Sequence, residues 1–195
     1  MNHAFFAMMS RMKYIERWAL MRNSKQETVS EHALQVGMIA HALAVISITR
    51  CGKTVDPEKA ALLGMYHDAS EIITGDMPTP VKYHNHEIQD AFQALEEKAN
   101  QQLLSMLPED MQPYYRSLFI PTEEDAYVHR LVKAADKLSA YIKCIEEANA
   151  GNSEFFSAQQ ATRASLEAMQ LPEIPIFIEE FLSPFGKNLD ELLRE

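Results

Sequence analysis

Apolar side chains recur every three or four positions along most of the chain, which is the spacing of one face of an α-helix. The clearest case is the segment 30–50, where Val36 and Ile39 share a face behind a capping box formed by Thr28-x-x-Glu31. Few polar residues interrupt this segment, so we expect it to be the central helix of the fold.

The same periodicity predicts a series of further helices. A second helix opens at Asp56-Pro57, which suits an N-cap and first-turn pair. Later helices are expected at 87–107, 122–150, 154–170, 176–183 and 188–194. The segment 74–82 carries a glycine and two prolines, so we expect an ordered loop there, and we expect Pro172 and Pro175 to interrupt the helices.

The composition agrees with an all-helical protein. Only 6 of the 195 residues are glycine, whereas strands joined by tight turns normally need more. Hydrophobic residues make up 47% and charged residues 24%, as in ordinary globular proteins, and no segment rich in Pro, Gly or Ser divides the chain. At roughly 150 residues per domain, we expect a single all-α domain, a helical bundle over residues 1–195.

The charge balance and the cysteines exclude several classes of protein. A net charge of −10 repels polyanions, so we expect no general binding to nucleic acid. Cys51 and Cys144 lack the spacing of a metal site or a disulfide framework and are expected to be free thiols. The N-terminus lacks the pattern of a signal peptide, and the apolar stretch 33–48 is shorter than the roughly 20 residues of a membrane span. These features predict a cytoplasmic protein with no membrane partner.

One group of polar residues has positions that suit metal ligands. His67 and Asp68 are adjacent at the end of the second predicted helix, and His32 is in the first turn of the first, on its apolar side. Asp136 lies among small apolar residues of the 122–150 helix. A carboxylate directed into the core is costly unless it is paired or binds a cation. Two imidazoles and two carboxylates suit Mn, Co, Fe or Zn; the alternative is that these residues only pack buried helices.

The order His32, His67-Asp68 and Asp136 resembles the H...HD...D signature of the HD-domain phosphohydrolases, an all-helical superfamily of metal-dependent phosphate-ester hydrolases. Further strings resemble the YfbR-type bacterial 5'-deoxynucleotidases, and the similar layout extends over nearly the whole chain. These strings are Arg17-Trp18, Ser30-Glu31-His32, Tyr66-His67-Asp68-Ala69-Ser70-Glu71, Thr74-Gly75-Asp76-Met77-Pro78-Thr79-Pro80-Val81-Lys82 and Ala135-Asp136. The His-Asp pair alone is nonspecific within the superfamily, whereas the Arg-Trp pair together with the Gly-Asp-x-Pro-Thr-Pro loop is specific.

The resemblance implies a homodimeric 5'-nucleotidase that hydrolyses deoxyribonucleoside 5'-monophosphates by attack of a metal-bound water. It implies one divalent metal ion, Co or Mn, with Mg, Zn and Fe as further candidates. The implied ligands are His32, His67, Asp68 and Asp136. The residues implied to bind substrate are Arg17, Trp18, His32, Asp68, Asp76, Met77, Pro78, Thr79 and Asp136, and those implied to be catalytic are Glu71, Asp76 and Arg17.

Two acidic residues outside the ligand set have positions that suit catalysis. Glu71 follows Asp68 by three residues, so its carboxylate could face the metal-bound water as a general acid or base. Asp76 follows Gly75 in a proline-rich loop, which could hold it against that water or against a sugar hydroxyl. The alternatives are a solvated carboxylate at a helix end for Glu71 and a turn-forming residue for Asp76.

Arg17 lies in a basic part of an acidic chain, because residues 11–25 hold five basic residues and one acid. Its guanidinium presents a planar set of donors to phosphate oxygens, and the alternative is a solvated basic face. Trp18 is the only tryptophan. We expect its ring to form a wall beside the sugar that excludes a 2'-hydroxyl, and the alternative is that it fills the core.

The remaining candidates for chemistry are expected to be structural. The other histidines considered lack matched partners and are assigned to packing or to the surface; they are His41, His84, His86 and His129. The 11 methionines are expected to fill the core. No residue after Gly151 is expected to take part in chemistry.

Two other functions remain as alternatives. One is another HD-domain hydrolase that acts on cyclic nucleotides or on guanosine tetraphosphate. The other is a nucleotide-sensing protein that keeps the fold and the metal without turnover. Glu71 argues against a sensor, because a sensor needs no group for proton transfer.

Overall fold

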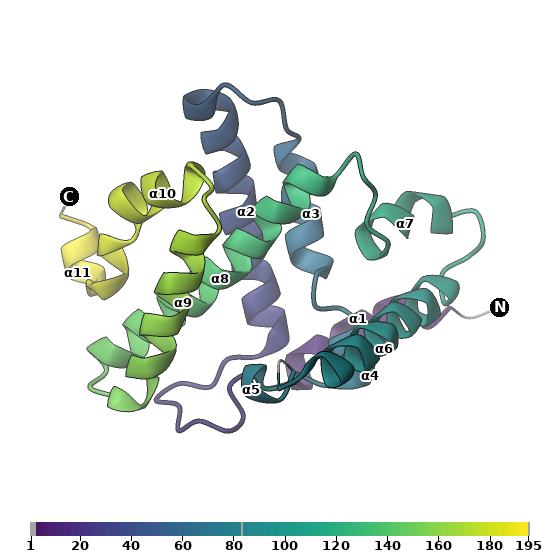
Figure 1. Cartoon of the computed structure of the whole chain (residues 1–195), viewed down its shortest axis with the longest axis horizontal. Coiled ribbons are helices and arrows are strands. Elements are labelled where there is room, and N and C mark those ends of the chain that lie inside the picture. Colours follow the sequence, from purple (N-terminus) through teal and green to yellow (C-terminus); the bar gives the residue numbers. More distant parts are fainter. Residues whose placement is uncertain (1–2, 83, 195) are drawn as a thin grey trace.

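The computed structural model describes residues 3–82 and 84–194, and within these ranges its regular elements are all helices (Figure 1). The α-helices are α1 Phe5–Met9, α2 Val29–Cys51, α3 Pro57–Tyr66, α4 Glu71–Thr74, α5 Thr79–Lys82, α6 His86–Ser105, α7 Gln112–Phe119, α8 Ala126–Asn149, α9 Phe156–Ala168, α10 Glu173–Phe181 and α11 Leu189–Leu192. The 3₁₀ helices are η1 Ser10–Tyr14, η2 Ser153–Phe155 and η3 Ser183–Gly186. The prediction of an all-α fold is confirmed.

Helix α2 is the central helix, as predicted, and it packs against α3, α8 and α10. The Thr28 hydroxyl accepts the backbone N–H of Glu31, and the Glu31 carboxylate accepts the backbone N–H of Thr28, which completes the capping box. At the other end, Gly52 adopts a left-handed φ of 65° that glycine takes without a steric cost. Both ends of the helix are therefore encoded locally.

Helices α2 and α3 cross at two glycines. A Cβ atom added to Gly64 would lie 2.8 Å from the Cα of Gly37, so a larger side chain would force the helices apart. This close crossing brings the first turn of α2 next to the last turn of α3, where the rings of His32 and His67 lie 5.2 Å apart. Two of the predicted ligands meet because of this crossing.

Helix α8 supplies the third wall of the core. Leu131, Leu138 and Ile142 are fully buried, and they belong to the same cluster as Val36 and Leu43 of α2. Figure 1 shows α8 running diagonally across α2 and α3. The position of α8 fixes where Asp136 meets the other two helices.

Helix α2 is, among the described residues, the one helix long and apolar enough by composition to cross a membrane. It is longer than the apolar stretch 33–48 on which the sequence argument relied. In its most apolar window, 56% is buried inside the protein. Packing in the core therefore accounts for its apolar character, and length and composition alone are weak support for a span.

Several helix boundaries differ from the predictions. The loop predicted at 74–82 contains the short helix α5, and Pro175 lies inside the first turn of α10 instead of interrupting it. Proline is tolerated in a first turn because the backbone N–H there has no helical acceptor. Helix α8 starts at Ala126 and not at 122, since the Thr122 hydroxyl donates to Asp125 (2.7 Å) in a turn before the helix.

Helices α1, η1 and α7 were not predicted at all. They are short, and tertiary contacts hold them: the Phe5 ring packs edge-on against Tyr115 at 5.4 Å and against Phe119 at 5.9 Å.

The expectation that methionines fill the core is wrong for most of them. Among the described methionines Met12 alone is buried, and the others lie at the edges of the core or are exposed.

Candidate active site

The four residues predicted as ligands converge from three helices. His32 lies in the first turn of α2, His67 caps the end of α3, Asp68 follows it, and Asp136 projects from the middle of α8. The His32 Nε2 atom lies 3.2 Å from the Asp136 Oδ1 atom and 3.5 Å from the Asp68 Oδ2 atom. The His67 Nε2 atom lies 3.0 Å from Asp68 Oδ2 and 4.0 Å from Asp136 Oδ1. We call these four residues the His-Asp cluster.

The far side of each imidazole ring is fixed by a hydrogen bond. The Nδ1–H group of His67 donates to the carbonyl of Gly64 (2.7 Å). The Ser139 hydroxyl donates to Gln35 Oε1 (2.6 Å), so its oxygen is free to accept the Nδ1–H group of His32 (3.0 Å). Each neutral ring then directs the lone pair of Nε2 into the cluster, as metal-binding histidines do.

The cluster fits a divalent metal ion. The Nε2 atoms of His32 and His67 are buried, and neither has a hydrogen-bond partner among the described residues. Ligand atoms of His32, His67 and Asp68 all lie within 4.8 Å of one another, and the Asp136 carboxylate adds a fourth. Imidazole nitrogens with carboxylate oxygens suit borderline and hard divalent ions. Buried polar atoms without partners are costly, and a cation would satisfy the lone pairs of these two nitrogens.

The charges within the cluster already stabilise one another. Burial alone would raise the pKa of Asp68, but His67 and His32 outweigh it and hold that pKa well below its usual range. The pKa of Asp136 is lowered in the same way, mainly by His32. Burial lowers the pKa of His67, and Asp68 and Asp136 overcome this and raise it to about 9. Since a metal ligand must be a neutral imidazole, metal binding displaces this proton.

Glu71 and Asp76 lie beside the cluster. Glu71 is the first residue of α4; it is buried, and its Oε2 atom has no hydrogen-bond partner among the described residues. Burial and the negative charges of Asp68 and Asp76 raise the pKa of Glu71 to about 9, with Arg17 and His67 opposing them. Glu71 is therefore not a solvated carboxylate at a helix end.

Asp76 is half-buried in the loop between α4 and α5. Burial raises its pKa, while Arg17 and the backbone N–H of Trp18 act to lower it. The carboxylate thus faces the Arg17-Trp18 pair as well as the cluster. A role limited to forming the turn does not account for these neighbours.

Arg17 approaches the cluster from a separate segment. Its Nη1 atom donates to Glu27 Oε2 (2.7 Å), and its Nη2 atom lies 3.9 Å from Asp136 Oδ1. The side chain is only 12% exposed, so Arg17 does not belong to a solvated basic face. Burial lowers its pKa, but Glu27 and then Asp136 outweigh this and leave the pKa raised.

Trp18 is half-buried, and its ring tilts against Phe155 with centroids 5.3 Å apart. Its Nε1–H group donates to Glu27 Oε2 (3.0 Å). The backbone has a φ of 59°, which costs a non-glycine residue about 1–2 kcal/mol. The contact with the buried Phe155 also agrees with the alternative that the ring fills the core, so the role of Trp18 beside the sugar stays a prediction.

The remaining residues of the predicted substrate loop follow Asp76 in the chain. Met77 and Pro78 are half-buried, and Thr79 is exposed at the start of α5. Their assignment to substrate binding stays a prediction.

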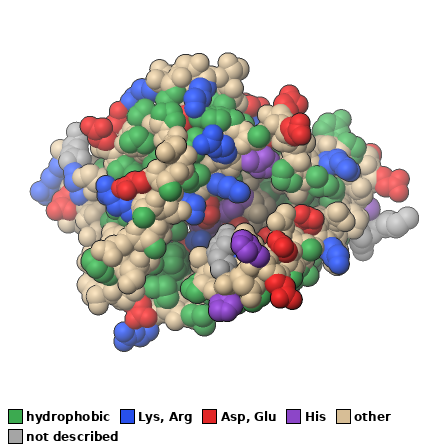
Figure 2. Space-filling model, in the orientation of Figure 1, with side chains coloured by type: hydrophobic (Ala, Val, Ile, Leu, Met, Phe, Trp, Pro, Cys, Tyr) green, Lys and Arg blue, Asp and Glu red, His purple; other side chains and the backbone are tan. Residues whose placement is uncertain are grey.

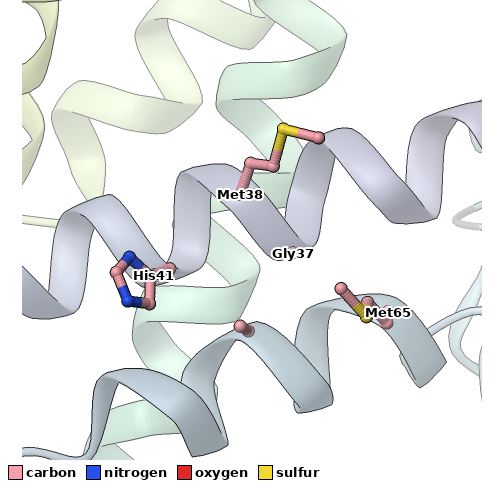
Figure 3. A pocket seen from close by; sticks show the side chains of 5 residues that line it. Gly37, Met38, His41 and Met65 are labelled. Carbon is pink, nitrogen blue, oxygen red and sulfur yellow. The ribbon is translucent and has the colours of Figure 1, made fainter.

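Figure 2 shows a hollow near the middle of one face, with histidine, basic and acidic side chains at its walls. A separate pocket lies between α2 and α3 and is lined by Gly37, Met38, His41, Ala61 and Met65 (Figure 3). None of the predicted site residues lines this second pocket. His41 is exposed there, which agrees with its assignment to the surface.

Other residues assigned to structural roles also behave as expected. His84 and His86 are exposed, and His129 is half-buried near Asp125. Cys51 and Cys144 are free thiols.

Sequence reasoning missed three residues that hold the site together, namely Glu27, Gln35 and Ser139. Gln35 and Ser139 each lie three residues after a predicted ligand, on the same side of its helix, and this spacing was an available signal. Glu27 gave no such signal, because only the folding of the segment between η1 and α2 brings it to Arg17. Phe155, after Gly151, also contributes by supporting Trp18.

Solved structures share this fold. An HD-domain phosphohydrolase from Listeria innocua superposes with a TM-score of 0.80 at 23% identity, covering 97% of this chain and 95% of its own. A cyanophage S-2L HD phosphohydrolase, described as bound to dA and one catalytic Zn²⁺ ion, gives a TM-score of 0.65 at 16% identity, covering 91% and 95%. At these identities the likeness establishes the fold alone.

The sequence comparisons are more specific. The chain is 49% identical over 194 residues to the 5'-deoxynucleotidase YfbR of Escherichia coli O1:K1, covering 98% of this chain and 96% of the relative. It is 47% identical to a 5'-deoxynucleotidase of Shewanella oneidensis, with 98% of each chain covered. The family model described as 5'-deoxynucleotidase YfbR-like matches residues 4–185. The chain therefore belongs to the YfbR-like family of 5'-deoxynucleotidases.

Proposed function

We propose that the protein hydrolyses deoxyribonucleoside 5'-monophosphates to a deoxynucleoside and inorganic phosphate, with one divalent metal ion as cofactor. The observation that carries the proposal is the pair of buried Nε2 atoms, of His32 and His67, that face two carboxylates and lack a partner among the described residues. Family membership supports the substrate class, since the relatives are named 5'-deoxynucleotidases. It also favours this activity over a cyclic-nucleotide hydrolase or a sensor.

The residues that would hold the metal are His32, His67, Asp68 and Asp136. When bound there, a divalent ion supplies Lewis acidity that favours deprotonation of water and polarises a phosphoryl oxygen. Cobalt or manganese is the first choice, with Mg, Zn and Fe as further candidates. The protein's own part is to keep both Nε2 lone pairs directed inward, through the hydrogen bonds of Gly64 and Ser139 to the two Nδ1 atoms.

Arg17 binds the phosphate. Its Nη2 atom faces the cluster while Nη1 is held by Glu27, so one part of the guanidinium is available to phosphoryl oxygens beside Asp136. A charge-assisted pair of this kind is roughly twice as strong as a neutral hydrogen bond, and it neutralises a substrate dianion in a chain of net charge −10. Arg17 also aligns the phosphorus for attack.

Glu71 moves a proton in the reaction. In the metal-free protein its pKa of about 9 keeps it protonated at neutral pH, and its buried Oε2 atom has no partner among the described residues. This protonated state suits donation to the leaving 5'-oxygen of the sugar. A bound cation would lower this pKa and so ease the release of the proton to the leaving oxygen.

Asp76 and Trp18 contact the sugar. The Asp76 carboxylate lies near the backbone N–H of Trp18, so both residues border the same space beside Arg17. Asp76 accepts a hydrogen bond from a sugar hydroxyl, and the indole excludes a 2'-hydroxyl by its volume. Met77, Pro78 and Thr79 complete this side of the substrate site. A homodimer and a cytoplasmic location complete the proposal.

A phosphate-release screen tests the proposal. Chelated protein is assayed on ribo- and deoxyribonucleoside 5'- and 3'-monophosphates, cyclic nucleotides and guanosine tetraphosphate, with Co, Mn, Mg, Zn or Fe restored in turn. We expect turnover of deoxyribonucleoside 5'-monophosphates only after a metal is added. Preferred turnover of a cyclic nucleotide or guanosine tetraphosphate would contradict the proposal that deoxyribonucleoside 5'-monophosphates are the substrates. An absence of turnover on every compound would favour the alternative that the protein is a nucleotide sensor.

A further inference from the structure

The segment from Arg17 to Glu27 is a closed loop whose ends are held together by the backbone. The Arg17 N–H donates to the Glu27 carbonyl (2.9 Å), and the Val29 N–H donates to the Ile15 carbonyl (2.9 Å). An isolated antiparallel bridge joins Glu16 and Thr28. The side chains of Arg17 and Glu27 consequently leave the backbone at neighbouring points.

Glu27 binds two side chains with one carboxylate oxygen. Its Oε2 atom accepts Nη1 of Arg17 at 2.7 Å and Nε1 of Trp18 at 3.0 Å. The Glu27 side chain is 13% exposed and that of Arg17 is 12% exposed. Such an ion pair is screened little by solvent, so the bond to Arg17 is strong and directional.

This contact constrains both partners. The guanidinium is planar, so fixing Nη1 against Glu27 also fixes the direction of Nη2, which lies 3.9 Å from Asp136 Oδ1. The Trp18 ring is held at Nε1 by Glu27 and on its face by Phe155. A residue at a φ of 59° needs such contacts to remain in one conformation.

We propose that Glu27 is a positioning residue that orients Arg17 and Trp18 together, and so couples the binding of the phosphate to the discrimination against a 2'-hydroxyl. Its effect on kinetics rests on the proposed function, whereas its effect on the orientation of Trp18 does not. Glu27 acts through its two partners and has no contact with the metal ligands in the described structure.

The other end of the loop is held independently of Glu27. The buried Glu147 carboxylate accepts the backbone N–H of Ser24 (2.8 Å), and Asn152 donates to the carbonyl of Arg22 (2.7 Å). Lys143 donates to the carbonyl of Lys25. A substitution of Glu27 therefore removes one contact of a loop that other residues still anchor.

The test compares Glu27→Gln with wild type and with Glu16→Gln. Glu16 is in the same loop closure and accepts Gln26 Nε2 (3.0 Å) at the exposed surface, so its variant is a matched charge control. Because Trp18 is the only tryptophan, its fluorescence and acrylamide quenching report this ring directly and need no substrate. Kinetics are measured on a deoxyribonucleotide and its ribonucleotide, and bound metal is measured by elemental analysis.

We expect Glu27→Gln to raise the acrylamide quenching of Trp18 and to leave the metal content unchanged. It should lower kcat/KM on the deoxyribonucleotide about 10- to 100-fold, the range typical of a hydrogen bond to a charged group. It should also lower the ratio of kcat/KM on the deoxyribonucleotide to kcat/KM on the ribonucleotide. Glu27→Asp keeps the negative charge but moves it away from Arg17 and Trp18, so its quenching and kinetic constants should lie between those of wild type and Glu27→Gln. Wild-type behaviour in Glu16→Gln supports the inference.

Three results would overturn the inference: unchanged quenching in Glu27→Gln, altered quenching with an unchanged kcat/KM, or a lower kcat/KM with an unchanged deoxyribo-to-ribo ratio. If Glu27→Gln does not fold, the same three criteria apply to Glu27→Asp. An inactive wild-type protein would instead reject the proposed function, and the quenching comparison would still decide whether Glu27 holds Trp18.

Discussion

Two polar clusters lie on α8, about three turns apart, and they differ in how their groups are satisfied. Around Glu147 the carboxylate has partners on every side: it accepts from Lys143, from the Ser24 N–H at 2.8 Å and from Asn152 at 2.7 Å. Around Asp136, the Nε2 atoms of both histidines have no hydrogen-bond partner among the described residues.

The pKa shifts of Glu147 and Glu71 differ in direction. Burial raises the pKa of Glu147, but the hydrogen bonds of Lys143, Asn152 and Ser24 lower it to about 2. Beside the His-Asp cluster, burial and like charges raise the pKa of Glu71 to about 9, whereas the pKa values of Asp68 and Asp136 within the cluster are lowered, as that of Glu147 is. The Glu147 cluster completes its own hydrogen bonds and stabilises the fold, whereas the His-Asp cluster leaves two imidazole nitrogens directed at two carboxylates without a hydrogen-bond partner among the described residues, as a site for a cation does.

The largest effect should come from Glu71→Gln, which removes the group proposed to move a proton. We expect kcat to fall by about 10²–10⁴-fold, with bound metal unchanged in elemental analysis. The exposed Glu58→Gln variant on α3 serves as the charge control. A Glu71→Gln protein that lost its metal would assign Glu71 to the ligand set instead.

At the structural cluster, Glu147→Ala should cost about 3–5 kcal/mol in the free energy of unfolding, because it leaves the buried Lys143 ammonium without its partner. Urea unfolding measures this loss, and the exposed neighbour Glu146→Ala provides the control. Metal affinity should not change. If Glu147→Ala lost metal affinity but kept its normal free energy of unfolding, the Glu147 cluster would not have the purely structural role assigned to it.

An intermediate effect is expected from Ser139→Ala, which removes the acceptor for the Nδ1–H group of His32. The affinity for a divalent metal should fall by about 10- to 100-fold, measured by titration of chelated protein. Ser47→Ala is the matched control, since Ser47 is also buried but donates to Glu173 away from the cluster. Equal affinities in the two variants would show that the Ser139 contact does not orient the ring.

The last prediction concerns the stability of the fold in acid. The pKa of Glu147 in the folded protein, about 2, lies below the ordinary 4.5, so its ionised form stabilises the fold above pH 4.5. This contribution should be lost progressively as the pH falls from 4.5 toward 2. Thermal unfolding at several pH values should show the loss in wild type and less of it in Glu147→Gln. Identical pH profiles would mean that Glu147 is not stabilised by its partners.

The long helices could be predicted from the sequence because their apolar periodicity and capping residues are local. Helix α2 shows this best, since the Thr28 capping box and Gly52 mark both ends. Helices α1 and α7 could not be predicted, because contacts such as that between Phe5 and Tyr115 stabilise them and these residues are far apart in the sequence.

The residues of the candidate site also differ in whether the sequence alone could point to them. His32 and Asp136 could be predicted as ligands because each is a polar residue on an apolar helix face and because their order resembles a known signature. Glu27 was not found, since its role depends on an ion pair with Arg17 across a folded loop. A polar residue on an apolar helix face can be recognised in the sequence, whereas a residue that acts through a contact across a folded loop cannot.

The most direct test is a titration of chelated protein with Co²⁺, following both the visible absorption of the bound ion and phosphate release from 2'-deoxyadenosine 5'-monophosphate. We expect one equivalent per chain to bind, activity to rise in step with binding, and both signals to be lost in Asp68→Ala. Full turnover in the chelated protein, or tight binding of Co²⁺ by Asp68→Ala, would contradict a catalytic metal at the His-Asp cluster.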